Sequence, residues 1–364
     1  MLVIVVGTGV IGCAVAWELA TRGASVRLLD QREVGAGASW ASAGVLCPWL
    51  DGSYTALTPM LAESSAMYEG LLARLTSATG RTVEFRRNGT LEVALTENEL
   101  PRLEAIAHAH AKHGVPHALL SAAQAIALEP ALNPGACGAV HVPAHGYVDV
   151  PALVQTMADA AERAGARIRP FAQVLDLGSS GSGVLVTGAD ETWSADAVVL
   201  ATGAWSGRLS VSDAAAAPVR PIRGQLLRFR GTSNPTHSMW SAHGYLVPWS
   251  DGTVLVGATH EDVGFDESNT DDAIASLTAC AREMVPSLAD APLIDARAGL
   301  RPYSADGMPI IGRSSSVPGL TWATGHGRNG VMLAPLTARM VADLVLEGRA
   351  GAFDALSSPT RFGL

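Results

Sequence analysis

The first residues of the chain alternate between apolar runs and short glycine or polar interruptions. Residues 2–6 are branched and apolar without alternation, which is typical of a parallel strand buried on both faces. Residues 13–22 have a helical composition that ends near Gly23, and residues 25–29 form a second branched run. This order of strand, glycine loop, helix and strand predicts a βαβ unit.

The loop of this unit carries the spacing G-x-G-x-x-G. Gly7 permits a tight turn, Gly9 lets a pyrophosphate approach the backbone, and Gly12 allows the helix to pack closely on the strand. Asp30 ends the second strand, where it can accept hydrogen bonds from a ribose diol. The unit predicts a bound dinucleotide, but it does not distinguish NAD from FAD, since both contain the same ADP half.

The remaining pattern predicts a second kind of architecture. Asp149 caps a helix that runs to residue 164, with Pro151 in its first turn. Residues 178–183 form a hairpin turn, and no second G-x-G-x-x-G precedes a helix, so a nicotinamide site is not expected. Strands of one further sheet are predicted at residues 90–95, 137–148, 223–230, 244–249 and 253–258, with helices at 97–113 and 271–284.

Composition narrows the class of partner. A chain of 364 residues with 48% apolar content predicts two domains, and its net charge of −9 is spread along the chain, which argues against nucleic acid or an anionic membrane. The 4 cysteines are far apart, so buried thiols are expected rather than a disulfide or a metal site. The apolar start lacks the cationic region of a signal peptide, and no other run is judged long enough to span a bilayer. A cytoplasmic protein is predicted.

Four later stretches carry a family resemblance. They are residues 37–44, 198–205, 299–312 and 324–335, and the last of them leads into a helical segment at residues 336–346. Together they resemble the FAD-dependent D-amino acid oxidase superfamily, and the patterns at 257–259 and 262–266 are most similar to the glycine oxidases of the thiamine pathway. The resemblance runs nearly from end to end and therefore favours FAD over NAD.

The resemblance implies an α/β fold with two domains. A Rossmann-like FAD-binding domain of the two-dinucleotide-binding-fold type would comprise residues 1–88, 148–222 and 295–364. An inserted α+β substrate domain with an antiparallel sheet would comprise residues 89–147 and 223–294.

It also implies a set of FAD-binding residues. The turn at residues 325–330 would open a helix whose N–H groups face the flavin and stabilise its reduced, anionic form. Tyr303 and Ser304 occupy the stretch where the covalent branch of the family has a cysteine, so non-covalent FAD is predicted. The predicted cofactor residues are Gly7, Gly9, Val10, Ile11, Gly12, Asp30, Gln31, Ala38, Ser39, Ala43, Gly44, Val45, Val174, Thr202, Gly203, His326, Gly327, Arg328, Asn329, Gly330, Val331 and Met332.

The substrate residues follow from the same resemblance. Arg301 would bind a substrate carboxylate through its planar fork, with Arg328 as a second candidate and the Tyr245 hydroxyl as a further contact. The implied reaction transfers a hydride from Cα to flavin N5, after which the imine is hydrolysed and O2 is reduced to H2O2. No side chain is assigned as a general acid or base.

Two positions depart from the family pattern. Gly327 stands where an aromatic residue is common, and His260 stands where an apolar residue is common, which predicts a roomier and more polar pocket. Glycine, sarcosine, another N-substituted glycine and a small D-amino acid therefore all stay open as substrates. A dehydrogenase with a non-oxygen acceptor and a flavoprotein subunit of a larger complex are the alternative functions, and a homo-oligomer is expected.

Overall fold

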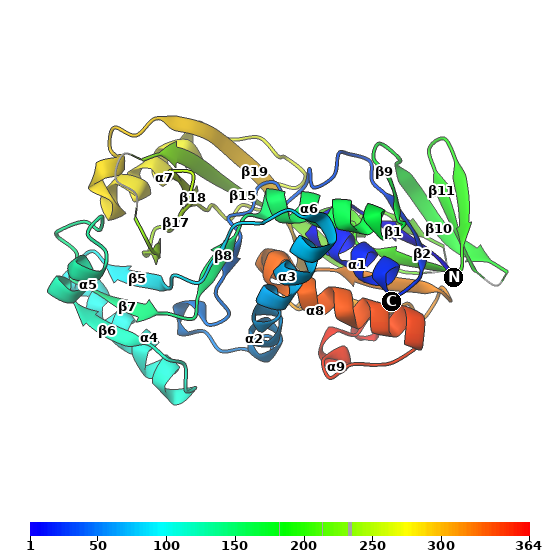
Figure 1. Cartoon of the computed structure of the whole chain (residues 1–364), viewed down its shortest axis with the longest axis horizontal. Helices are drawn as coiled ribbons and strands as arrows, with labels where there is room; N and C mark the ends of the chain where they lie inside the picture. The colour runs from blue at the N-terminus through cyan, green and yellow to red at the C-terminus, as the bar shows by residue number, and fades with distance from the viewer. Residues whose placement is uncertain (182, 213, 232–234) are drawn as a thin grey trace.

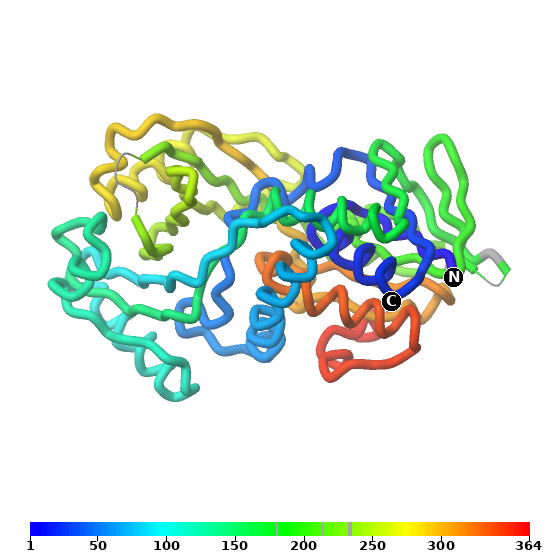
Figure 2. The backbone as a smooth tube through the Cα atoms, viewed as in Figure 1, coloured from blue at the N-terminus to red at the C-terminus, as the bar shows by residue number. Residues whose placement is uncertain are grey.

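The computed structural model describes residues 1–181, 183–212, 214–231 and 235–364. The molecule is elongated, with both termini at one end and a large sheet with its helices at the other (Figure 1). The chain passes between the two ends several times, as the backbone tube shows (Figure 2). The fold is a mixed α/β arrangement of the predicted kind.

A six-stranded sheet forms the core of the end that carries the termini. Its order is β20-β21-β13-β1-β2-β9, parallel throughout except for the antiparallel edge strand β20. The bounds are β1 Leu2–Val6, β2 Ser25–Leu29, β9 Arg167–Arg169, β13 Ala197–Leu200, β20 Ile310–Arg313 and β21 Leu320–Thr324. The predicted βαβ unit is confirmed.

Three helices pack together on this sheet. Helix α1 (Val10–Thr21) contacts both α6 (Val150–Arg163) and α8 (Gly330–Ala342). Helix α1 begins at Val10, earlier than predicted, because Gly9 is its N-cap residue and has an extended conformation. The cap of α6 is confirmed, since the Ala152 N–H donates to the Asp149 carboxylate at 3.1 Å.

Helix α8 is longer than the predicted segment 336–346. It begins at Gly330, and a π-helical turn (Asp343–Glu347) extends it. Residues 327–347 are long and apolar enough to cross a membrane by length and composition, so the prediction that no such run exists is wrong. Two thirds of this segment, 67%, is buried inside the protein, where α8 packs in the core beside α1.

An eight-stranded sheet forms the opposite end, in the order β19-β15-β18-β17-β16-β5-β7-β6. It is antiparallel apart from the β5–β16 pair. Its bounds are β5 Thr90–Ala94, β6 Ala118–Ser121, β7 Gly138–Val142, β15 Val219–Arg230, β16 Ser238–Trp240, β17 Tyr245–Pro248, β18 Thr253–Gly257 and β19 Leu293–Ser304. Helices α4 (Leu100–Lys112) and α7 (Asp271–Met284) accompany it, close to their predicted positions.

Part of one strand prediction is wrong. Residues 137–148 contribute β7 to the large sheet, but β8 (Gly146–Val148) pairs with β3 (Val45–Leu46) and β4 (Phe85–Arg86) in a separate three-stranded sheet. The turn around Pro143 separates β7 from β8, because proline supplies no N–H to a sheet ladder. The remaining helices are α2 Thr58–Ala66, α3 Tyr68–Thr79, α5 Ala122–Leu128 and α9 Asp354–Ser357.

A fourth sheet contains the predicted hairpin. Strands β10 (Val174–Ser180) and β11 (Gly183–Gly188) are antiparallel, with β12 (Thr192–Ala195) and β14 (Ser210–Val211) at the edges. Gly178 lies inside β10, so the turn is shorter than predicted, and residue 182 lies outside the described residues.

The two ends share two long strands. Strands β15 and β19 pair along their length, and the predicted boundaries at 222/223 and 294/295 fall inside them. The domain boundaries therefore stay a prediction. All cysteines are free as expected; Cys13, Cys47 and Cys280 are buried, but Cys137 is partly exposed. Among the described residues, no group of three or more His, Cys, Asp and Glu side chains could hold a metal ion.

Candidate cofactor and substrate site

A cavity of about 920 Å³ extends from the first residues of α1 to the first residues of α8. Residues from both ends of the molecule line this cavity. Every predicted cofactor residue except Gly12 lines it, and so do Arg301, Arg328 and Tyr245. The fold thus brings segments more than three hundred residues apart to one cavity, but the individual roles of these residues stay predictions.

The glycine loop has the close packing that its spacing predicts. Gly7 has a φ of +108°, and a Cβ there would overlap the Ala201 carbonyl oxygen of the neighbouring strand. A Cβ on Gly12 would overlap the carbonyl oxygen of Gly7, so Gly12 serves helix packing and does not face the cavity. Gly9 does face it, and the Val10 N–H donates to the Ser39 hydroxyl at 3.0 Å.

Asp30 lines the cavity and also braces the loop. Its Oδ2 accepts hydrogen bonds from the Thr8 N–H at 2.7 Å and from the Thr8 hydroxyl at 2.8 Å. Its Oδ1 accepts from the Arg32 N–H at 2.9 Å. The sequence analysis missed Thr8, and only its position inside the glycine motif could have indicated it.

Hydroxyl groups join the carboxyl ends of β13 and β21. Ser206 Oγ lies 2.9 Å from Thr202 Oγ1 and 2.6 Å from Thr324 Oγ1, and it donates to the Gly203 carbonyl at 2.8 Å. This chain of hydroxyls fixes Thr202 and Gly203 at the cavity wall, within the stretch 198–205 that carries the family resemblance.

The turn before α8 presents backbone to the cavity. Its N-cap residue Asn329 makes no side-chain cap, and Val331 and Met332 of the first turn line the cavity. His326 is buried, its Nε2 lies 3.1 Å from the Thr337 hydroxyl, and burial lowers its pKa to about 3. His326 is therefore neutral, and its contact with Thr337 ties the turn to α8.

These features fit FAD. The helices α1 and α8 both begin at the cavity without a side-chain cap, so first-turn N–H groups and positive dipole ends face it. The glycine loop at residues 7–12 leaves room for a pyrophosphate, which a side chain there would block. Residues at the α1 end would hold the adenine half, and those at the α8 end would hold the flavin.

Arg301 is held by backbone carbonyls. Its Nη1 donates to the Thr259 carbonyl at 2.9 Å and lies 3.5 Å from that of Arg223. Its guanidinium lies so close over Gly224 that a Cβ there would overlap it. Within the described part of the chain, neither Arg301 nor Arg328 has a carboxylate ion-pair partner, which leaves further N–H groups for an anion.

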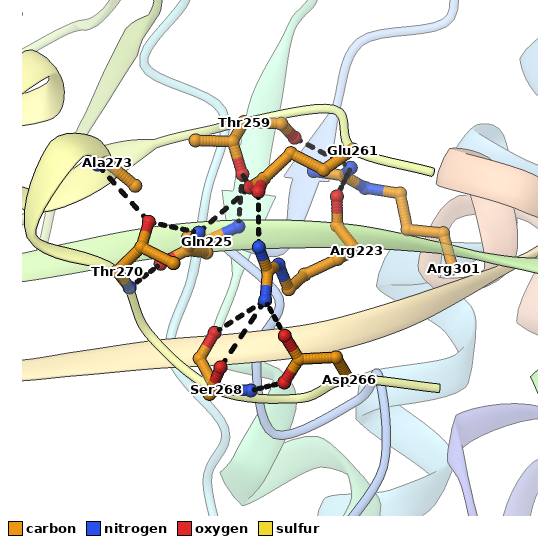
Figure 3. A network of polar contacts seen from close by, with 9 residues as sticks. All are labelled: Arg223, Gln225, Thr259, Glu261, Asp266, Ser268, Thr270, Ala273 and Arg301. Carbon is orange, nitrogen blue, oxygen red and sulfur yellow. Dashed lines mark hydrogen bonds and ion pairs between the residues drawn. The ribbon is translucent and has the colours of Figure 1, made fainter. Parts of the chain in front are cut away.

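A polar network built on the buried Arg223 and Gln225 fixes the segment that holds Arg301 (Figure 3). Glu261 accepts hydrogen bonds from Arg223 at 2.5 Å, from Gln225 at 2.8 Å and from the Thr259 hydroxyl at 2.5 Å. Burial opposes the charge of Glu261, but these hydrogen bonds lower its pKa to about 2. Arg223 also pairs with Asp266 at 2.5 Å, with only 4% of its side chain exposed.

Aromatic rings surround the substrate end. The Tyr245 ring lies over Gly257, where a Cβ would come within 2.6 Å, and burial raises the pKa of the Tyr245 hydroxyl, which is therefore neutral. A Cβ on Gly327 would lie 3.5 Å from the Tyr303 ring. A Cβ would thus fit at 327 in ordinary contact with this ring, and Tyr303 bounds the space beside Gly327, so the roomier pocket stays a prediction.

Three lining residues near Asp30 were missed by the sequence analysis. The guanidinium of Arg32 lies 4.4 Å above the Trp205 ring, and that of Arg208 lies 3.5 Å above the Phe265 ring. Arg32, Trp205 and Arg208 line the cavity. Trp205 ends the stretch 198–205 that carries the family resemblance, which is the one signal that could have indicated it.

The fold and this cavity define a flavin-dependent oxidoreductase. The family model described as "FAD dependent oxidoreductase" matches residues 3–344, so the chain belongs to that family. Two relatives are close in sequence. The chain is 34% identical to the glycine oxidase of Geobacillus kaustophilus over 97% of this chain and 94% of that protein. It is 35% identical to the glycine oxidase of Pseudomonas putida, with 94% of each chain covered.

Solved structures agree with this assignment. The crystal structure of the Geobacillus kaustophilus glycine oxidase has a TM-score of 0.93, covering 99% of this chain and 98% of that one at 34% identity. The iminodiacetate oxidase of Chelativorans sp. BNC1 has a TM-score of 0.88 at 27% identity, covering 98% of each chain. The protein is therefore a glycine oxidase-like, FAD-dependent oxidoreductase.

Proposed function

We propose that this protein is an oxidase of small amino acids that contain an aminoacetate unit, with or without a substituent on nitrogen or on Cα. The observation that carries the proposal is Arg301, whose guanidinium is anchored in the cavity that fits FAD and has no carboxylate partner among the described residues. Glycine and iminodiacetate, which are named for the related oxidases, both contain this unit.

Arg301 orients the substrate through its carboxylate. One edge of the guanidinium is occupied by the Thr259 carbonyl, and the remaining N–H groups bind the two carboxylate oxygens. The neutral Tyr245 hydroxyl donates a hydrogen bond to the same group. Holding the carboxylate at two points fixes the direction of the Cα–H bond.

When bound, FAD would supply the acceptor for the Cα hydrogen and its electron pair, and O2 would take up the two electrons with two protons as H2O2. The substrate is left as an imine, which water hydrolyses to a 2-oxo acid and ammonia or an amine. The amine must enter unprotonated, so no side chain of this chain is needed as a base, and none is assigned.

We propose that FAD is bound non-covalently. Among the described residues, Cys47 is the cysteine that lines the cavity. Burial raises the pKa of its thiol, and the neighbouring Glu92 raises it further, so Cys47 is not a reactive thiolate. The cytoplasmic location, the homo-oligomer and the thiamine pathway stay predictions.

An anaerobic screen tests the proposed function. The purified holoenzyme is mixed with glycine, sarcosine, D-alanine and L-alanine, and loss of the oxidised flavin absorbance is followed. We expect bleaching by at least one of the first three, and loss of bleaching with retained FAD in Arg301→Met. Arg282→Met, on the exposed face of α7, is the matched control.

The anaerobic screen, together with a measurement of H2O2 release in air, separates the alternative functions. A dehydrogenase would be bleached anaerobically but would release no stoichiometric H2O2 in air. A flavoprotein subunit that needs a partner chain would bind FAD and be bleached by no amine, and that result would contradict the proposal.

A further inference from the structure

The substrate end of the cavity carries more positive charge than one carboxylate can neutralise. The two guanidinium groups of Arg301 and Arg328 line it together with the His260 ring, and the three residues come from separate segments of the chain. The acidic residues that line the cavity are Asp30, Glu33, Asp51 and Glu92. None of these belongs to the segments that carry Arg301, Arg328 and His260.

The nearby carboxylates are already engaged. Glu92 accepts from the Asp51 N–H at 2.8 Å and from Arg102 at 3.2 Å. Asp262, close to His260 in sequence, pairs with Arg220. Within the described residues, Arg328 has no ion pair, so its charge at the cavity has no partner from this chain.

His260 is held beside these arginines. Its ring packs edge-on against Tyr303, with centroids 5.4 Å apart and an interplanar angle of 83°. Tyr303 in turn lies against Gly327, the residue before Arg328. Partial burial lowers the pKa of His260, and the arginine guanidinium groups, first that of Arg301, lower it further. At neutral pH His260 is therefore a neutral ring with an N–H to donate.

The two arginines are not equivalent. Arg301 is anchored by a backbone carbonyl and by its contact with Gly224, which suits it to one fixed carboxylate. Arg328 is exposed and lies in the glycine turn before α8, so its guanidinium can reach a group farther from Cα. A monocarboxylic amino acid on Arg301 leaves Arg328 without an anion.

We propose that Arg328 and His260 form a second anion subsite, and that the preferred substrates are amino acids with a second acidic group. The second carboxylate can be carried on nitrogen, as in iminodiacetate, or on the side chain, as in D-aspartate. This inference rests on the proposed function, because it names the substrate class of the same site.

Matched substrate pairs test the subsite. The value of kcat/KM for iminodiacetate is compared with that for sarcosine, and the value for D-aspartate with that for D-alanine. We expect at least one dicarboxylate to exceed its partner by about 10- to 100-fold, the effect of one charge-assisted hydrogen bond. If iminodiacetate has the higher kcat/KM of its pair, the second carboxylate is carried on nitrogen. If D-aspartate has the higher kcat/KM of its pair, the second carboxylate is carried on the side chain.

Variants of Arg328 and His260 test whether these two residues cause the higher kcat/KM of the dicarboxylates. Arg328→Met should reduce the dicarboxylate-to-monocarboxylate ratio by about tenfold or more, and His260→Met should reduce it by a smaller factor. Arg282→Met on α7 should leave the ratio unchanged. FAD content is measured for each variant, so that cofactor loss is not mistaken for a change in specificity.

A binding measurement is independent of turnover. Malonate and acetate are titrated into the holoenzyme, and their Kd values are read from the perturbation of the flavin spectrum. Malonate should bind more tightly than acetate, and Arg328→Met should remove most of that difference.

The outcomes separate this inference from the proposed function. If glycine or sarcosine bleaches the flavin but both dicarboxylates are poorer substrates, the oxidase assignment stands and the second subsite is wrong. If no amine bleaches the flavin but malonate still binds through Arg328, the subsite stands and the proposed function is wrong. A ratio that Arg328→Met does not change overturns the subsite.

Discussion

The Arg301 guanidinium lies across the backbone of Gly224, and its Nη1 donates to the Thr259 carbonyl. Glu261 does not touch Arg301, but it holds Thr259 and Arg223, the residues whose carbonyls face the guanidinium. Arg301 is therefore positioned by backbone that the polar network around Arg223 and Glu261 keeps in place (Figure 3). This arrangement leaves most of its hydrogen-bonding capacity for a ligand.

Gly224→Ala should displace Arg301 without unfolding the protein. The new Cβ would overlap the end of a flexible side chain, which can move away, so the unfolding midpoint should change little. KM for the amino acid should rise about tenfold or more, because the carboxylate contact is misplaced. Gly70→Ala in α3, where a Cβ meets nothing within 4 Å, is the control: KM should stay constant and stability should rise by about 0.5–1 kcal/mol.

Two buried histidines should make stability depend on pH. Burial lowers the pKa of His145 and of His326 to about 3 each, whereas an unfolded histidine titrates near 6.5. Below pH 6.5 the unfolded chain binds protons that the folded chain excludes, so the free energy of unfolding should fall as the pH falls toward 3. At pH 5.5 each histidine accounts for about 1 kcal/mol of this loss.

Urea unfolding of the holoenzyme at pH 7.5 and pH 5.5 measures this effect. His145→Gln should reduce the loss of stability between the two pH values. His108→Gln, on the exposed side of α4, should not reduce it. An equal pH dependence in both variants would contradict the assignment.

Helix α8 illustrates how one element depends on its neighbours. Pro335 lies inside it and has no N–H to donate to the Val331 carbonyl, which is four residues earlier. The Tyr68 hydroxyl of α3 donates to that carbonyl at 2.5 Å, and the Leu336 N–H donates to the Ser64 hydroxyl of α2 at 3.2 Å. Side chains from α2 and α3 therefore complete the hydrogen bonding of the helix that begins at the flavin end.

Tyr68→Phe should leave the Val331 carbonyl buried without a donor. The free energy of unfolding should fall by about 1–3 kcal/mol, and the Kd for FAD should rise, because Val331 lines the cavity. Tyr147→Phe is the matched control, since the buried Tyr147 hydroxyl donates to Glu84 at 3.0 Å, away from α8. It should lower stability without changing FAD affinity.

On the scale of the whole molecule, the segment 258–270 joins the two ends across the cavity. At the sheet end, Arg223 pairs with Glu261 and Asp266. At the cofactor end, Glu267 pairs with Arg32 at 2.7 Å, and the Phe265 ring lies 5.8 Å from Trp205 and packs against Arg208. The segment that holds Arg301 thus also covers the cavity near Asp30.

Phe265→Ala should weaken FAD retention. Arg208 and Trp205, which line the cavity, would lose the ring that packs against them, and we expect the Kd for FAD to rise by about tenfold, equivalent to about 1.4 kcal/mol. FAD release on dilution, followed by flavin fluorescence, measures this change. Val263→Ala, at an exposed position of the same segment, should release FAD at the original rate.

Local sequence was sufficient to predict a structural feature where one contiguous segment contains all the residues that interact to form it. The glycine loop, the Asp149 cap and helix α7 were predicted correctly, because turn geometry, capping and helical periodicity act over a few residues. Strands β6, β16 and β19 were missed. Strand β6 is short and mostly exposed, β16 has 3 residues, and β19 carries Arg297 and Arg301 among its apolar positions.

By itself the sequence determined the class of the protein and about a third of the residues that line its cavity, because these belong to short motifs with fixed spacing. Only the tertiary structure decided how those residues are supported. The Thr259 carbonyl on Arg301, the Tyr303 ring on Gly327 and the Tyr68 hydroxyl on Val331 join segments far apart in the chain. Such contacts depend on strand register and helix packing, which no local pattern encodes.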